Sequence, residues 1–207
     1  MVSTGFYDTP RLMNIKGENL PKVKHFYDEP HPYIGQKVLV IGAANSACDV
    51  ALELYYKGAA VTMSVRKESI SHRVKYWIKP NIENRIKEGS INAYFNTTIA
   101  EITPTSVLLN TPEGQIEIEN DWVLAMTGYK PNFDFFRKIG IELADDGFLT
   151  PIHNKETLET NMPNIYIAGV INSGMQTSKL FIENTRIHAG MIISDLTKKI
   201  KDSVLVS

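Results

Sequence analysis

Apolar residues follow two different periods in the first third of the chain, and together they predict a βαβ unit. Residues 38–41 are all apolar and lead into Gly42, as in a short buried strand that ends at a turn. Residues 47–54 place apolar side chains at i, i+3, i+4 and i+7, and Gly58 follows this helical stripe. Residues 59–65 then form a second apolar run. The pattern predicts strand, turn, helix and strand in that order.

The turn of this unit has the spacing of a dinucleotide-binding turn. It reads G-x-A-x-x-A from Gly42 to Ala47, whereas such turns read G-x-G-x-x-G/A. Ala44 departs from the glycine that lets a backbone approach pyrophosphate. Asn45 and Ser46 are good N-caps at the point where the helix must begin. A purely structural crossover is the alternative to cofactor binding. The candidate binding residues at the turn are Gly42, Ala43, Ala44, Asn45 and Ser46.

The rest of the chain predicts more strands, a β-meander and three helices. Short β-runs at 99–103, 106–110 and 115–119 predict an antiparallel meander, because residues 111–114 form a hairpin signal. The segment before residue 36 has scattered Pro and Gly without a clear period, so we expect a loop-rich connector there. Further strands are predicted at 91–95, 122–126 and 165–168, and helices at 77–89, 133–139 and 181–198.

Basic residues follow the second strand, about twenty residues after the glycine turn. An acidic residue at this place would bind the ribose hydroxyls of NAD, whereas a cation suits the 2′-phosphate of NADP. Arg66 and Lys67 stand there, and the planar fork of Arg suits a phosphate dianion. Arg73 and Lys75 add charge to the same region. We therefore expect NADPH to bind, with a solvated surface pair as the alternative.

Composition narrows the possible functions. The net charge is −1, and 43% of residues are hydrophobic and 22% charged, as in an ordinary globular protein. We expect no nucleic-acid partner, no membrane partner and no signal peptide, and a cytoplasmic location. Cys48 is the single cysteine; a helix N-terminus can activate a thiol, but a packing role is favoured. His72 and His188 lack spaced ligand partners, so we expect no metal site and assign no catalytic residue.

Nine stretches of the sequence carry a family pattern. The chain resembles the two-dinucleotide flavoprotein reductases of the thioredoxin-reductase-like branch, and within it the bacillithiol disulfide reductase type. The stretches are S-T-G-F-Y-D (3–8), L-P-K-V-K-H-F-Y (20–27), H-P-Y (31–33), V-I-G-A-A-N-S-A (40–47), V-K-Y-W-I-K-P (74–80), M-T-G-Y-K-P (126–131), N-K-E-T (154–157), Y-I-A-G-V-I (166–171) and I-E-N-T-R-I-H-A-G (182–190).

The resemblance implies an α/β fold in which one domain is inserted into another. Residues 36–127 would form a Rossmann-like NADPH-binding domain with a parallel sheet and an antiparallel meander. Residues 1–35, a remnant and connector, and residues 128–207 would belong to an FAD-binding domain. The flavin would contact two segments near the ends of the chain. The residues implied in cofactor binding outside the inserted domain are Thr4, Gly5, Gly128, Gly169 and Val170.

The implied activity is that of an NADPH-dependent FAD flavoprotein oxidoreductase that reduces a low-molecular-weight disulfide, as a homo-oligomer. A flavin monooxygenase-like enzyme and a non-catalytic nucleotide-binding module are the alternatives. The family pattern begins with its own βαβ unit for the flavin pyrophosphate, which this sequence does not show. Val170 follows Gly169 where related reductases have Asp. We therefore expect a truncated chain that binds NADPH, carries no flavin and is inactive alone.

Overall fold

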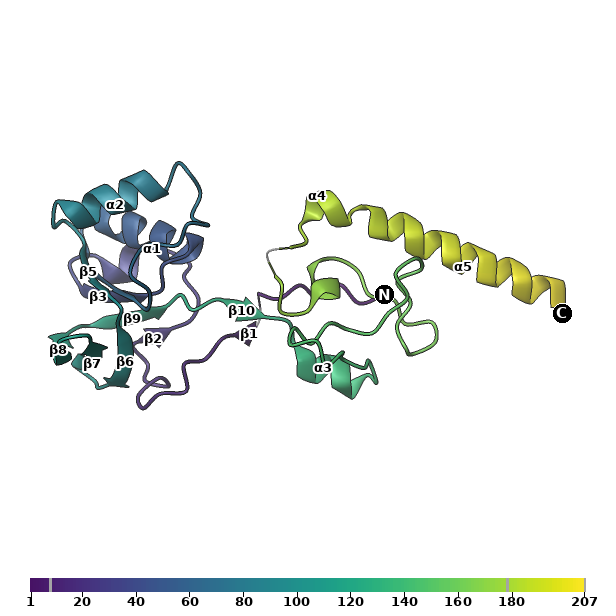
Figure 1. Ribbon diagram of the computed structural model, residues 1–207, viewed down its shortest axis with the longest axis horizontal. Helices are drawn as coiled ribbons and strands as arrows, with labels where there is room; N and C mark the ends of the chain where they lie inside the picture. Colours follow the sequence, from purple (N-terminus) through teal and green to yellow (C-terminus); the bar gives the residue numbers. More distant parts are fainter. Residues whose placement is uncertain (8, 178, 207) are drawn as a thin grey trace. The chain divides into compact units, whose positions relative to one another are not determined.

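The computed structural model describes residues 1–7, 9–177 and 179–206 (Figure 1). Asp8, the last residue of the motif at 3–8, lies outside the described residues. Contacts divide the chain into two compact units. One contains residues 12–127, and we call it the inserted unit; the other contains residues 1–11 and 128–207, and we call it the split unit. The chain order alone makes one unit an insertion in the other.

A five-stranded parallel sheet forms the centre of the inserted unit. Its strands lie in the order β2-β9-β3-β4-β5. The central strands are nearly continuous apolar runs, because both faces of a parallel sheet are covered. The predicted βαβ unit is confirmed, since β3 and β4 pair in parallel with Lys37 opposite Ala60 and Ile41 opposite Ser64. The strands are β2 (Val23–Lys24), β3 (Lys37–Ile41), β4 (Ala60–Val65), β5 (Asn92–Phe95) and β9 (Trp122–Ala125).

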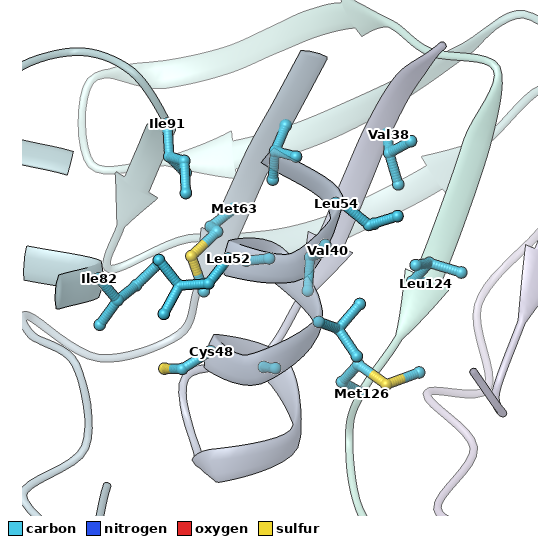
Figure 2. Packing of buried hydrophobic residues seen from close by; sticks show 14 of the residues in the cluster. Val38, Val40, Cys48, Leu52, Leu54, Met63, Ile82, Ile91, Leu124 and Met126 are labelled. Carbon is cyan, nitrogen blue, oxygen red and sulfur yellow. The ribbon is translucent and has the colours of Figure 1, made fainter. Parts of the chain in front are cut away.

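Helices α1 (Asn45–Tyr56) and α2 (Lys79–Lys87) cover one face of this sheet (Figure 1). Figure 2 shows the core between these helices and the sheet, where Val40 and Met63 from the strands meet Leu54 from α1. Gly58 follows the end of α1 with φ at +89°, as a helix-terminating glycine does. The long apolar stripe of α1 is therefore buried as its period predicted.

The other face of the sheet is covered by the antiparallel meander. It consists of β6 (Thr98–Ile102), β7 (Ser106–Thr111) and β8 (Gly114–Glu119). Successive residues of a strand point to opposite faces, so β3 serves both layers. Val38 and Val40 join the helix-side core, while Leu39 and Ile41 join the meander-side core. The predicted meander is confirmed and supplies the third layer of the unit.

Residues 12–35 pack with the inserted unit rather than forming a free connector. Val23–Lys24 adds strand β2 beside β9, and the 3₁₀ helix η1 spans His31–Tyr33. The buried carboxylate of Glu18 accepts the N–H groups of Met13 and Asn14, each at 2.7 Å. The expected boundary at 35/36 thus falls inside this unit, whereas 127/128 coincides with a unit boundary. The assignment of the parts to NADPH and flavin stays a prediction.

The split unit has little regular structure before its last helices. Its elements are β1 (Thr9–Pro10), β10 (Tyr129–Lys130), α3 (Phe133–Lys138), the 3₁₀ helix η2 (Val170–Ser173), α4 (Ile182–Thr185) and α5 (Ile187–Val206). The strand predicted at 165–168 is reduced to single bridges of Tyr166 and Ile167. The helix predicted at 181–198 is divided at Arg186 and continues to Val206.

One further difference concerns the beginning of the helix predicted at 77–89. Trp77 was expected on the stripe of α2, but this helix begins at Lys79 with Pro80 in its first turn. Proline suits that place because its missing N–H would be unpaired there in any case. Trp77 therefore precedes the helix, and 61% of its surface is exposed. The tyrosine before it is also exposed.

Candidate functional site

The dinucleotide turn, residues 42–47, needs a glycine at its first position. Gly42 has φ at +132°, and a Cβ built there would lie 2.6 Å from the carbonyl oxygen of Met126 and 3.1 Å from the Cβ of Ala47. Its N–H donates to the carbonyl of Ser64 at 3.0 Å, which ties the turn to the end of β4. Ala47 is completely buried. The turn thus has the two small residues that bring a helix close to a strand.

Helix α1 begins at Asn45, so its N-cap is the residue before the two that were expected as caps. Ala44 is the N-cap, with extended backbone at φ −98° and ψ −175°, and it makes no side-chain cap. The prediction that Asn45 and Ser46 cap the helix is therefore wrong, because both already lie inside its first turn. Within the described residues, the N–H groups of Asn45 and Ser46 donate to no protein acceptor. They are open to an anion at the helix N-terminus.

A basic segment, residues 71–75, lies against this turn through three hydrogen bonds. The N–H of Ser71 donates to the carbonyl of Ala43 at 3.0 Å. The N–H of Lys75 donates to Oδ1 of Asn45 at 2.9 Å, and Nδ2 of Asn45 donates to the carbonyl of Arg73 at 3.4 Å. The structure thus brings the backbone of Arg73 and Lys75 to the turn.

Four cations belong to two segments that adjoin the turn. Arg66 and Lys67 directly follow β4, whose end lies beside Gly42, and Arg73 and Lys75 belong to the basic segment. All four are exposed, and none forms an ion pair with a carboxylate of the described residues. The ammonium of Lys75 lies 5.3 Å from the ring centroid of Trp77. Open cations beside free N–H groups form a site that suits phosphate.

Cys48 has no reactive role in this arrangement. Its side chain is completely buried in the helix-side core, as Figure 2 shows. Burial, followed by the charges of Asp49 and Glu83, raises the pKa of its thiol to about 12. Reactive cysteines have lowered pKa values and some exposure. Cys48 is therefore a packing residue, as its place in the sequence indicated.

One hollow of the inserted unit lies away from the turn. A cavity of about 290 Å³ is lined by Lys37, Ala60 and Asn120, among others. These residues lie at the amino-terminal ends of the strands, whereas Gly42 follows the carboxyl end of β3. Ligands of open parallel sheets bind at the carboxyl ends of the strands. The turn, and not this cavity, is therefore the candidate ligand site of the sheet.

The remaining candidate residues lie in the split unit. A parallel bridge pairs Val2 with Ile167, and these residues stand two positions before Thr4 and Gly169 respectively. Gly5 and Gly169 have φ at +70° and +83°, and an added Cβ would meet nothing within 4 Å at either place. Open backbone of this kind lets a flat ligand approach closely.

Gly128 and His188 are held by neighbours inside the split unit. Gly128 has φ at +92°, and its carbonyl accepts the N–H of Arg11 at 2.9 Å. The N–H of Gly169 donates to Nδ1 of His188 at 3.1 Å. Burial, and then the charge of His153, lowers the pKa of His188, which keeps the ring neutral and able to accept this bond.

Asn172 is a feature that the sequence analysis missed. It lies in η2, and only 7% of it is exposed, yet neither Oδ1 nor Nδ2 has a partner in the described part of the chain. Buried amides are normally bonded, so an unpaired one near a candidate site is a place for a ligand group or water. Its sequence signal was an amide directly after the apolar run V-I.

The described residues also bear on metal binding and on membrane spans. Among residues 1–7, 9–177 and 179–206, no group of three or more His, Cys, Asp or Glu side chains could hold a metal ion. The described helices also include none that is long and apolar enough to cross a membrane.

Comparisons with known proteins agree with this geometry. Residues 1–169 match the family model of the pyridine nucleotide-disulphide oxidoreductases. The chain is 42% identical over 200 residues to the bacilliredoxin reductase Bdr of Bacillus subtilis, which covers 96% of this chain and 61% of that protein. The fold also matches solved structures. The bacillithiol disulfide reductase Bdr of Bacillus cereus matches with a TM-score of 0.90 at 39% identity, over 96% of this chain and 61% of that one.

A more distant structure supports the fold alone. The thioredoxin reductase of Lactococcus lactis matches with a TM-score of 0.67 at 20% identity, over 93% of this chain and 65% of that one. The chain thus spans about three fifths of the length of the two closer proteins, at 61% of each. The α/β fold with a Rossmann-like unit inserted in a second unit is confirmed. With its family model matched over residues 1–169, the chain belongs to the pyridine nucleotide-disulphide oxidoreductase family.

Proposed function

We propose that the whole protein is an NADPH-dependent FAD flavoprotein that reduces a low-molecular-weight disulfide. The observation that carries the proposal is the 42% identity with a bacilliredoxin reductase along 96% of the chain. The structure of a bacillithiol disulfide reductase with 39% identity adds support. FAD, when bound, supplies the acceptor for the nicotinamide hydride and passes the electrons on. The protein's own contribution is binding, orientation and electrostatics.

The NADPH part of the proposal rests on the turn and its cations. The glycine turn and the open N–H groups of α1 suit the pyrophosphate, and Arg66 with Lys67 suits the 2′-phosphate. Arg66→Ala should weaken NADPH binding by about 1.5–3 kcal/mol, the range for a hydrogen bond to a charged group, and leave NADH binding nearly unchanged. Calorimetric titration of both cofactors measures this difference.

A matched control is Lys57→Ala, since Lys57 is an exposed cation at the other end of α1. It should bind both cofactors as the unchanged protein does. Equal losses for NADPH and NADH in Arg66→Ala would contradict the 2′-phosphate role. If Lys57→Ala also loses NADPH affinity, the effect of Arg66→Ala reflects the general surface charge and not a specific contact.

The flavin part of the proposal rests on the two neighbouring segments of the split unit. The bridge of Val2 with Ile167 joins the segment that leads to Thr4 and Gly5 with the one that leads to Gly169 and Val170, and the unpaired amide of Asn172 follows the second segment. We expect protein purified from its complete reading frame to be yellow, with FAD released on denaturation. If the protein is colourless and cannot be reconstituted with FAD, the flavin part of the proposal is wrong and only nucleotide binding remains.

The proposed substrate is a disulfide whose identity can be narrowed by experiment. Two chemistries follow from the names of the relatives: bacillithiol disulfide, which is a small molecule, and bacilliredoxin. We propose the small disulfide, and NADPH consumption with bacillithiol disulfide tests it. Turnover only with a bacilliredoxin mixed disulfide would favour the second substrate. Peroxide formation without disulfide turnover would point to a monooxygenase-like enzyme instead.

We also propose a homo-oligomer in the cytoplasm. The exposed side chains Ile187, Ile193 and Ile200 on α5 support association, because they leave apolar surface uncovered. The unpaired, buried thiol of Cys48 is compatible with a reducing compartment. Light scattering of the purified protein and fractionation of cells test these two statements separately.

A further inference from the structure

The side chain of Asn45 is used inside the protein. Asn45 is the first residue of α1, where a cofactor phosphate would otherwise be its natural partner. Its Oδ1 instead accepts the N–H of Lys75 at 2.9 Å, and its Nδ2 donates to the carbonyl of Arg73 at 3.4 Å. Both groups of the amide are thus directed to the backbone of the basic segment. A phosphate at the turn would meet the N–H groups of the helix and not this side chain.

The basic segment depends on few contacts for its position. Residues 66–78 contain neither helix nor strand, and between the buried residues Ile70 and Ile78 only Val74 reaches the core. At its far end, the carbonyl of Lys75 accepts the N–H groups of Ile78 and Lys79, at 2.9 and 3.0 Å, which joins the segment to the start of α2. The bonds that hold the segment to the turn itself are the bond from Ser71 and the two bonds of Asn45. The two cations that it carries are placed by the backbone that Asn45 holds.

The other two cations are placed independently of Asn45. Arg66 and Lys67 follow β4 directly, and the carbonyl of Lys67 accepts the N–H of Asn96 at 3.0 Å. The carbonyl of Val65 accepts the N–H of Thr97 at 3.1 Å. The end of β4 is therefore held by the two residues that follow β5. The site has one pair of cations held by the sheet and one pair held by a side-chain amide.

We propose that Asn45 is a positioning residue for cofactor selectivity. It holds the basic segment on the dinucleotide turn, so that Arg73 and Lys75 are in place before the 2′-phosphate arrives. Ordering charged side chains in advance lowers the entropy that binding must otherwise remove. The inference rests on the proposed use of NADPH, and it goes further by assigning the discrimination from NADH partly to a residue that does not touch the 2′-phosphate.

The test uses Asn45→Ala and two probes that differ only in the 2′-phosphate, 2′,5′-ADP and 5′-AMP. Loss of the main bond should weaken 2′,5′-ADP binding by about threefold to tenfold, in line with one neutral hydrogen bond, and change 5′-AMP binding much less. Alanine is the best helix former, and Asn45 contributes no buried apolar surface, so the variant should fold. Its thermal unfolding midpoint checks this. Asn84→Ala, an exposed position on α2, is the matched control.

A double-mutant cycle separates positioning from direct contact. The effect of Asn45→Ala on the ratio of the two affinities should disappear when Arg73 and Lys75 are already alanine. It should persist in an Arg66→Ala background, because Arg66 is placed by the sheet. An effect that persists without the two cations of the segment would overturn the positioning role and indicate that Asn45 contacts the probe itself.

Amide hydrogen exchange gives a readout that needs no ligand. The N–H of Lys75 should exchange faster in Asn45→Ala than in the unchanged protein, and Asn45→Asp should restore its protection, because the carboxylate keeps an acceptor at that place. Unchanged exchange in Asn45→Ala, or an unchanged affinity ratio, overturns the inference while the proposed function stands. If the unchanged protein itself binds 2′,5′-ADP no better than 5′-AMP, the proposed NADPH preference fails first.

Discussion

Gly42 has no room for a side chain, so Gly42→Ala tests how closely the dinucleotide turn is packed. The new methyl group would lie 2.6 Å from the carbonyl oxygen of Met126, which is backbone and cannot rotate away, and 3.1 Å from the Cβ of Ala47. The residue would also keep a positive φ of +132°. Positive φ costs a non-glycine residue roughly 1–2 kcal/mol, and overpacking adds about 1–3 kcal/mol. We therefore expect Gly42→Ala to lower the free energy of unfolding by about 2–5 kcal/mol.

Gly58→Ala separates the two contributions. Gly58 has φ at +89°, but an added Cβ would meet nothing within 4 Å, so this variant should show the backbone strain alone. Urea denaturation followed by tryptophan fluorescence suits the comparison, because Trp77 and Trp122, the two tryptophans of the chain, both lie in the inserted unit. If Gly42→Ala lowers stability no more than Gly58→Ala, the close approach of helix and strand at this turn is refuted.

Two more predictions concern buried and paired groups. Because burial raises the pKa of Cys48 to about 12, its thiol should stay protonated at pH 8 and react with a thiol reagent only after unfolding; reaction in the native state would contradict the buried position. The ammonium of Lys199, 2.5 Å from Glu159, lowers the pKa of Glu159 below its unfolded value. That stabilisation is complete above the unfolded pKa of about 4.3 and is lost as the pH falls through the lower folded value, so the unfolding midpoint should drop more steeply in acid for the unchanged protein than for Glu159→Gln.

Local periodicity predicted the inserted unit well. The βαβ unit and the meander follow from patterns within one element or one hairpin, and so does the short helix α3 (Phe133–Lys138) of the split unit. Cys48 was favoured as a packing residue, and its side chain is buried. These features depend on residues that are close together in the sequence. The grouping of the four candidate cations at a phosphate site stays a prediction; the structure shows the backbone of Arg73 and Lys75 bonded to Asn45.

The errors come from contacts between distant residues. Asn45 looked like a cap, but its side chain bonds the backbone of Lys75, thirty residues later, and no local pattern contains this pairing. The short strand at Val23 exists because β9 offers it an edge. The expected strand at 165–168 pairs only at single residues, because its partners, Val2 and Glu159, come from irregular segments. In each case the partner, and not the residue itself, decides the structure.

The interruption of one unit by another sets an order for the assembly of the chain during synthesis. Residues 12–127 leave the ribosome as one continuous stretch and contain all their own strand pairings, so this unit can fold while the rest is still being made. Val2, by contrast, must wait for Ile167. Closing so long a flexible loop has an entropic cost that grows with its length. A folded insert replaces that loop with a compact body, so the early unit acts as a folding aid for the late one.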